Sequence, residues 1–276
     1  SLPVGRLLAP QRAYAGSSPV DDSRGLFVSG DVASSTVVYY FPGLNGTCEK
    51  IRERLSEFPQ NVMNIALNVQ VSGNGEYRRH SVMQTLFDRL TRGVTGKSYS
   101  SGDRTSTTQR VDSSIQNSED QVNTLVTRFE MLETELMQRV MEASGQTRPA
   151  NTNRIMVFHS GAFAGFERLY HSGVFDFGPS VVRGIFLSDC LYNKDVNENM
   201  IELAGRPDAG INMYAVHINS ASDSGMGPDT FDERFHATER GWSERSQSGT
   251  SHSEIPVHYI QFAINLLTTG GMGVSN

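Results

Sequence analysis

The sequence predicts a single α/β domain built on a mostly parallel β-sheet with helices on both faces. Short runs of β-branched, aromatic and aliphatic residues recur along the chain, as is typical of strands buried on both sides. Segments whose apolar residues have helical spacing separate these runs, so strands and helices alternate. The length of 276 residues is enough to bury one large core. We therefore expect one domain over residues 25–276.

The net charge, the length of the apolar runs and the cysteine positions argue against several classes of function. The net charge of -6 argues against a nucleic-acid binder, which would need a basic face. No apolar run approaches the length of a membrane span, so a soluble protein is expected. The first residue is Ser1 rather than Met, which fits a leader that has been removed, and the compartment and oligomeric state stay open. Cys48 and Cys190 lie far apart and suggest neither a metal cluster nor a disulfide framework.

The first part of the chain is expected to contain an arm, three strands and a helix. Residues 1–24 are rich in Pro, Ser, Gly and Ala and show no period, which favours an arm over the surface. Strand patterns follow at residues 25–30, 36–41 and 63–71. A helix is expected over residues 47–58, because its apolar residues share one stripe.

A glycine-containing loop, Pro42-Gly43-Leu44-Asn45-Gly46, follows the strand pattern at 36–41. Glycines permit a close backbone approach, so N–H groups here could reach a developing oxyanion. We therefore expect Leu44 or Asn45 to supply one donor of an oxyanion hole.

The middle of the chain changes character. Residues 72–117 predict an insertion or flap, with helical spacing over 76–92 and a Ser-, Thr- and Gly-rich stretch over 93–117. Residues 119–143 then give the longest helical pattern, with a broad apolar stripe.

The most informative stretch is residues 154–170, RIMVFHSGAFAGFERLY. A strand-like apolar run at 155–158 changes to helical spacing after Ser160. A Ser at a sharp strand-to-helix turn is typical of a nucleophile elbow, which exposes the Ser oxygen at the carboxyl edge of the sheet, near the positive end of the new helix. The alternative is that Ser160 only caps the helix.

The C-terminal part continues the alternation. Strands are expected at residues 180–188 and 211–218, with a helix between them through Met200 and Leu203. A short helix is expected near residues 231–236 within a polar segment, 223–253. The last helix is expected over residues 255–267, with Pro256 in its first turn.

Three chemically suitable residues border these elements in the order Ser160, Asp189, His252, which is the chain order of α/β-hydrolases. Over roughly residues 25–270 the sequence resembles that superfamily. It is most similar to bacterial hydrolase-like proteins with a His-Ser-Gly-Ala-aromatic elbow and an Asp-x-Leu-Tyr after the following strand. The matching residues are His159-Ser160-Gly161-Ala162-Phe163 and Asp189-Cys190-Leu191-Tyr192.

This resemblance implies a serine hydrolase of the esterase, lipase or peptidase type. Ser160 would be the nucleophile, His252 the base, and Asp189 the acid that orients the imidazole. The Gly161 N–H would complete the oxyanion hole beside Leu44 or Asn45. The substrate would be a small molecule or peptide with an ester or amide bond, cleaved through an acyl-enzyme, and no cofactor is expected.

Two positions depart from the usual pattern. Phe158 stands where the elbow commonly has a small residue, so its ring must find space elsewhere. Asp189 follows the strand directly after the elbow, whereas the commoner acid position is one strand later. That later position makes Asp223 the alternative acid.

The other histidines leave alternatives open. His258 is the alternative base, His217 is expected in the core, and His159 is expected to be structural. Glu233-x-x-His236 matches half of a helical metal pair without a second half, so no metal site is expected.

A different class of function also fits this sequence. A non-catalytic member of the same fold would use the same cleft for binding or assembly.

Overall fold

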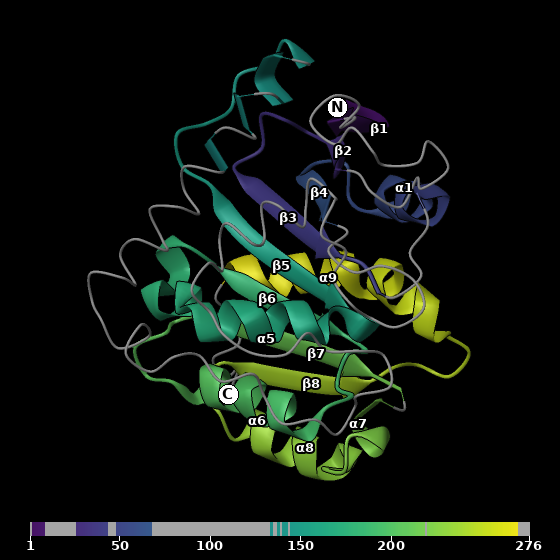
Figure 1. Ribbon diagram of the computed structural model, residues 1–276, viewed down its shortest axis with the longest axis vertical. Coiled ribbons are helices and arrows are strands. Elements are labelled where there is room, and N and C mark those ends of the chain that lie inside the picture. The colour runs from purple at the N-terminus through teal and green to yellow at the C-terminus, as the bar shows by residue number, and fades with distance from the viewer. Residues whose placement is uncertain are drawn as a thin grey trace, which may run out of the picture.

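The computed structural model describes residues 2–8, 26–43, 48–67, 133–134, 137–138, 140–142, 144–218 and 220–269. Its strands form one eight-stranded sheet in the order β1-β2-β4-β3-β5-β6-β7-β8 (Figure 1). Neighbours from β4 to β8 are parallel, whereas β2 is antiparallel to both β1 and β4. The strands are β1 (Leu2–Leu8), β2 (Leu26–Gly30), β3 (Thr36–Phe41), β4 (Met63–Leu67), β5 (Asn153–His159), β6 (Gly184–Ser188), β7 (Asn212–His217) and β8 (Gly241–Arg245).

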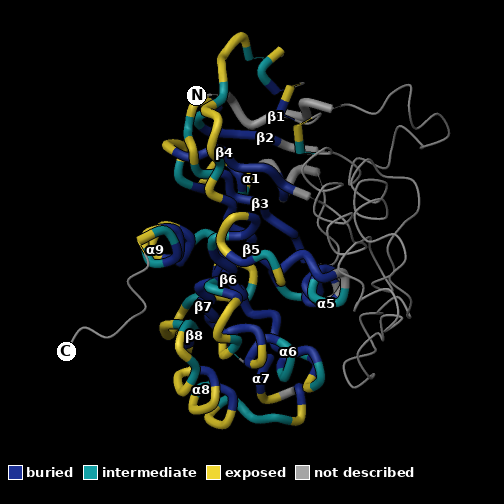
Figure 2. The backbone as a smooth tube through the Cα atoms, turned by 90° about the vertical axis from the view of Figure 1, so that its left-hand side faces the viewer, coloured by how far each residue is buried: buried dark blue, intermediate teal, exposed yellow. Residues whose placement is uncertain are grey.

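Helices cover both faces of this sheet, with α9 on one side and α5 and α6 on the other (Figure 2). The α-helices are α1 (Cys48–Glu57), α5 (Phe163–Ser172), α6 (Lys194–Gly205), α7 (Ser220–Asp223), α8 (Pro228–His236) and α9 (Ile255–Thr269). The 3-10 helices are η1 (Ser160–Ala162), η2 (Val174–Ser180) and η3 (His252–Glu254). The described residues from 133 to 142 and residue 144 are helical. The predicted α/β fold, with a mostly parallel sheet and packed helices, is confirmed.

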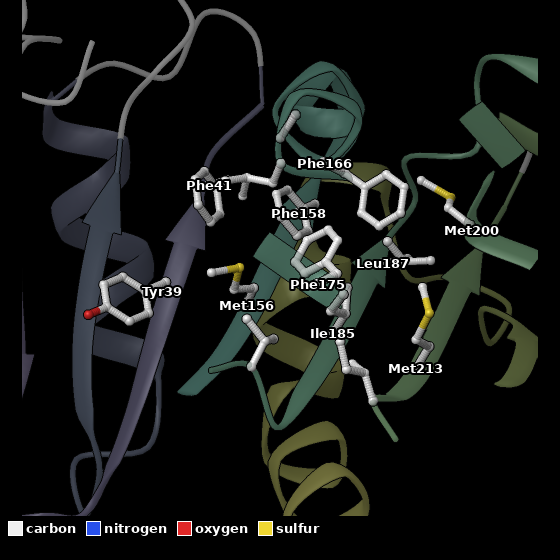
Figure 3. Close-up of a cluster of buried hydrophobic side chains, with 14 of the residues drawn as sticks. Tyr39, Phe41, Met156, Phe158, Phe166, Phe175, Ile185, Leu187, Met200 and Met213 are labelled. Carbon is white, nitrogen blue, oxygen red and sulfur yellow. The ribbon is translucent and has the colours of Figure 1, made fainter. Parts of the chain in front are cut away.

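The alternation of side chains along β5 divides the core into two layers. Met156 and Phe158 face the layer that contains α5, α6 and α8, where the cluster in Figure 3 lies. Ile155 and Val157 face the layer that contains α1 and α9. Because both faces are buried, the strand reads as an uninterrupted apolar run in the sequence.

The structure corrects three sequence-based expectations. Leu2–Leu8 is not an irregular arm but strand β1, which pairs with β2 through an irregular register at the sheet edge. The strand expected from residue 180 begins only at Gly184, because η2 extends to Ser180 and the N–H groups of Val181 and Val182 both donate back to the Gly178 carbonyl. Strand β8 was not predicted, since its sequence GWSER contains no apolar run. The expected flap and helix of residues 72–117, like all of 68–132, lie outside the described residues.

Parallel pairing brings the carboxyl ends of β5, β6 and β7 to one edge of the sheet. Ser160 directly follows β5 and Asp189 directly follows β6. Ligands of open α/β sheets bind at this edge. Within the described residues, no helix combines the length and apolar character that crossing a membrane requires.

Candidate active site

Ser160 occupies a strained turn between β5 and the helical residues after it. Its φ is 54°, in the left-handed region that a non-glycine residue rarely adopts. The alternative role as a helix cap is not supported, because His159 and Ala162 hold the N-cap positions of η1 and α5. The turn instead leaves Ser160 half-buried at the carboxyl edge of the sheet. Strain of this kind is concentrated at functional sites.

Phe158 stands where the usual elbow pattern has a small residue, and its side chain lies away from the turn. Its ring is fully buried below the turn and stacks on Phe41 of β3, with centroids 4.6 Å apart. The ring of Phe166, on α5, meets it edge-on at 5.8 Å (Figure 3). The bulky residue therefore packs into the core and stays out of the turn that carries Ser160.

Asp189 begins the turn after β6 and, like Ser160, has a positive φ, at 45°; among the described residues these two are the non-glycine residues with this conformation. Its Oδ1 accepts hydrogen bonds from the Ile218 N–H at 3.0 Å and from Ser220 Oγ at 2.8 Å. Its Oδ2 lies 2.5 Å from His252 Nδ1. Burial alone would raise the pKa of Asp189, but the hydrogen bonds from His252, Ile218 and Ser220 outweigh it and hold that pKa below its ordinary value.

His252 lies in η3, just before α9, and its side chain is 41% exposed. A capping box fixes this turn, with the Ser251 N–H donating to Glu254 Oε2 at 3.0 Å. Because Nδ1 donates its proton to the Asp189 carboxylate, Nε2 is left as the nitrogen that can accept a proton. The contact expected between Asp189 and His252 is therefore present.

His159, directly before Ser160, is buried against both of these turns. Its Nδ1–H donates to the Ser188 carbonyl at 3.0 Å, and its ring centroid lies 4.7 Å from that of His252. Burial, with the nearby His252 as a smaller contribution, lowers the pKa of His159 to about 3. The ring is therefore neutral near neutral pH.

The loop after β3 runs against Ser160. A Cβ placed on Gly43 would lie 2.9 Å from Ser160 Cβ, so only glycine fits this approach without a shift. Gly161, the residue after Ser160, is buried. Leu44 and Asn45, the expected oxyanion donors of this loop, lie outside the described residues.

The alternative base is not part of this arrangement. His258 is exposed on α9, with its ring 4.9 Å from that of Tyr259. Asp223 is the last residue of α7, and its side chain lies outside the description, whereas the carboxylate paired with His252 is that of Asp189. Among the described residues, no hydrogen bond joins the Ser160 hydroxyl to His252.

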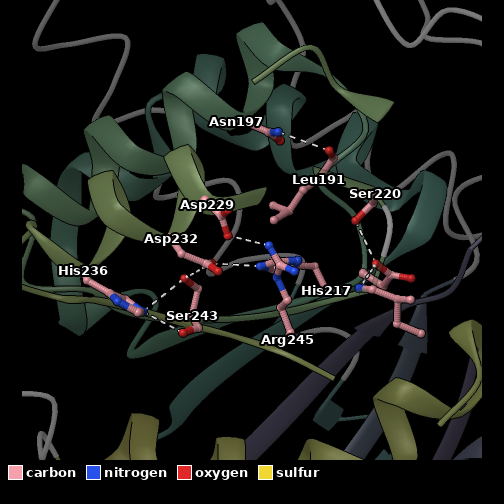
Figure 4. Close-up of polar contacts among 11 residues, drawn as sticks. Leu191, Asn197, His217, Ser220, Asp229, Asp232, His236, Ser243 and Arg245 are labelled. Atoms are coloured by element: carbon pink, nitrogen blue, oxygen red, sulfur yellow. Dashed lines mark hydrogen bonds and ion pairs between the residues drawn. The ribbon is translucent and has the colours of Figure 1, made fainter. Parts of the chain in front are cut away.

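A second polar cluster lies between β7, α8 and β8 (Figure 4). His217 Nε2 lies 2.8 Å from Asp232 Oδ1, which also accepts from Ser243 Oγ at 2.5 Å. His236 Nε2 lies 2.6 Å from the Ser243 carbonyl oxygen. His217 is fully buried, as the sequence predicted for a core residue, but only its Nε2 is paired, and its Nδ1 has no hydrogen-bond partner among the described residues.

Sequence reasoning did not identify Ser220 as a partner of Asp189. The sequence did contain a signal for this contact. A polar run that includes Ser220 follows the strand at residues 212–217, and this strand ends beside the strand that Asp189 follows. In the part of the chain that the structure describes, no group of three or more His, Cys, Asp or Glu side chains is arranged to hold a metal ion.

No family model matches the chain, and no curated protein has a matching sequence.

Proposed function

We propose that this protein is a serine hydrolase that cleaves an ester or amide bond, with Ser160 as nucleophile, His252 as base and Asp189 as acid. The observation that carries the proposal is the Asp189–His252 hydrogen bond of 2.5 Å, formed at the sheet edge where Ser160 sits in a left-handed turn. An imidazole oriented by a buried carboxylate beside a strained Ser is the arrangement that activates a hydroxyl nucleophile.

The sheet topology supports a likeness to α/β-hydrolases. In that superfamily, the nucleophile stands at a strand-to-helix turn, and the residue after it supplies one oxyanion N–H. A second N–H comes from the loop after the third strand. Here Gly161 follows Ser160, and the loop after β3 reaches Ser160 at Gly43. The order Ser160, Asp189, His252 is also that of the superfamily.

The mechanism follows from these positions. Ser160 Oγ attacks the substrate carbonyl carbon while His252 Nε2 takes the hydroxyl proton. Asp189 holds the Nδ1–H and balances the charge of the imidazolium. Backbone N–H groups of Gly161 and of the loop after β3 stabilise the oxyanion. His252 then returns the proton to the leaving group, and a water, activated in the same way, releases the acid and frees Ser160.

Hydrolysis of a p-nitrophenyl ester tests the proposal. Ser160→Ala is expected to lower kcat by about a thousandfold or more while the melting temperature stays close to that of the wild type, because a triad acts as a unit. Ser56→Ala, an exposed position on α1, is the matched control and should keep full activity. Substantial activity in Ser160→Ala would contradict the nucleophile assignment.

One observation favours a second candidate, a non-catalytic protein that uses the same edge for binding or assembly. No hydrogen bond joins Ser160 to His252 among the described residues, although such bonds often tighten only when substrate is bound. A folded protein that neither hydrolyses esters nor reacts with serine-directed probes would support this candidate.

A further inference from the structure

We infer that His159 is a positioning residue, whose ring holds the His252 imidazole in place between the nucleophile turn and the acid turn. The inference rests on the proposed function and extends it to a residue that the triad does not include. His159 precedes Ser160 in the chain, its Nδ1–H donates to the Ser188 carbonyl at 3.0 Å, and its ring contacts that of His252 at a tilt. One side chain thus touches the turns that carry all three proposed catalytic residues.

The contact with His252 is made ring against ring. The two centroids are 4.7 Å apart and the ring planes are inclined by 31°. Tyr192, three residues after Asp189, meets His252 at 6.3 Å with the planes at 75°. The His252 side chain is 41% exposed, and its hydrogen bond to Asp189 fixes the position of Nδ1 alone. The rings of His159 and Tyr192 restrict rotation of the His252 ring about its hydrogen bond to Asp189. This restriction sets the direction in which Nε2 points.

The hydrogen bond to Ser188 keeps the His159 ring in its orientation. Ser188 is the last residue of β6, and Asp189 follows it directly, so the anchor lies on the same turn as the acid. Because Nδ1 carries the proton that Ser188 accepts, the tautomer of His159 is set as well. The ring is buried and neutral near neutral pH, so it places no charge beside the imidazolium that forms during the reaction.

This geometry gives His159 a role distinct from catalysis. Its ring contacts the base and a backbone carbonyl, and the reacting atoms belong to its neighbours. A misplaced base slows the chemical step while substrate binding is little affected, and displacements of about 1 Å can cost roughly a hundredfold. Loss of the ring face should therefore lower kcat and leave KM unchanged.

Three variants separate the ring face from the hydrogen bond. His159→Phe keeps a flat ring and loses the donor to Ser188. His159→Asn keeps a donor near the Nδ1 position and loses the ring. His159→Leu loses both at similar bulk. The experiment measures kcat and KM on p-nitrophenyl acetate, with the melting temperature of each variant and of Ser160→Ala as the reference for lost chemistry.

We expect the Phe variant to keep kcat within about threefold, and the Asn and Leu variants to lose about tenfold to a hundredfold in kcat at unchanged KM. A Leu variant with wild-type kcat would overturn the inference and leave the proposed function intact. An Asn variant that outperforms Phe would overturn it too, because the hydrogen bond rather than the ring would then matter. If the Leu variant does not fold, the comparison of Phe with Asn decides alone. A wild-type protein without esterase activity would overturn the proposed function, and this inference with it.

Discussion

His252 Nδ1 lies 2.5 Å from Asp189 Oδ2, although 63 positions separate the two residues in the chain. The pairing depends on the parallel order of β5, β6 and β7, which brings the turn after β6 to the edge that η3 overlies. The other carboxylate oxygen is occupied by the Ile218 N–H and Ser220, so the orientation of the acid is fixed from two sides.

Asp189→Asn should reduce ester hydrolysis by about ten-thousandfold, because an amide favours the wrong tautomer of the base. Asp223→Asn, at the alternative acid position, is the control and should stay near the wild type. Steady-state kcat on a p-nitrophenyl ester measures both. A large loss of kcat in the Asp223 variant with a small loss in the Asp189 variant would mean that Asp223, and not Asp189, is the acid.

His252→Ala should lower kcat by about a thousandfold or more, since the proton acceptor is removed. His258→Ala removes an exposed imidazole from the same part of the chain and should change kcat less than about twofold. Circular dichroism checks that both variants are folded. Equal activity of the two variants would remove His252 from the mechanism.

Gly43→Ala should reduce kcat by about a hundredfold, because the new Cβ would lie 2.9 Å from Ser160 Cβ and push the loop and the nucleophile apart. Gly205→Ala is the matched control, since a Cβ there meets only Thr238 at the ordinary distance of 3.5 Å. If Gly43→Ala retains wild-type kcat, the loop after β3 does not contribute to the site.

The buried His159 should make the protein less stable as the pH falls. Its pKa is about 3 in the folded state and 6.5 when unperturbed, so between these values the unfolded state binds a proton that the folded state does not. The stability contribution is lost as the pH falls from 6.5 towards 3, at up to about 1.4 kcal/mol per pH unit. Between pH 7.5 and pH 5, the wild type should therefore lose about 2 kcal/mol of unfolding free energy relative to His159→Phe.

Urea unfolding of both proteins at the two pH values measures this change. A difference that does not vary with pH would mean that His159 titrates normally in the folded protein.

The strands that the sequence predicted best are those buried on both faces. Residues 37–41 and 213–216 are continuous apolar runs because helices cover both sides of these strands. Strand β8 escaped prediction because it is an edge strand, with Trp242 46% exposed and Arg245 bonded to Asp229 on the surface. Pro3 and Gly5 interrupt the pattern of β1 in the same way.

Part of the candidate site could also be predicted from sequence. Parallel strand ends meet at one edge, so strand order predicts that Asp189 lies close to Ser160. The approach of His252 was expected only because the polar loop before the last helix is long enough to fold back over that edge. The ring contact between His159 and His252 could not be predicted, because neither helical nor strand periodicity determines which ring from a distant loop a side chain meets. The bond from Ser220 to Asp189 depends in the same way on the local path of the chain after β7.

Covalent labelling with a fluorophosphonate probe tests the central claim most directly. The folded wild-type protein is incubated with the probe, and the modified residue is located by peptide mass spectrometry. We expect one adduct, on Ser160, with labelling lost in Ser160→Ala and strongly slowed in His252→Ala. Folded protein that stays unlabelled, or that is labelled at a serine other than Ser160, would contradict the account.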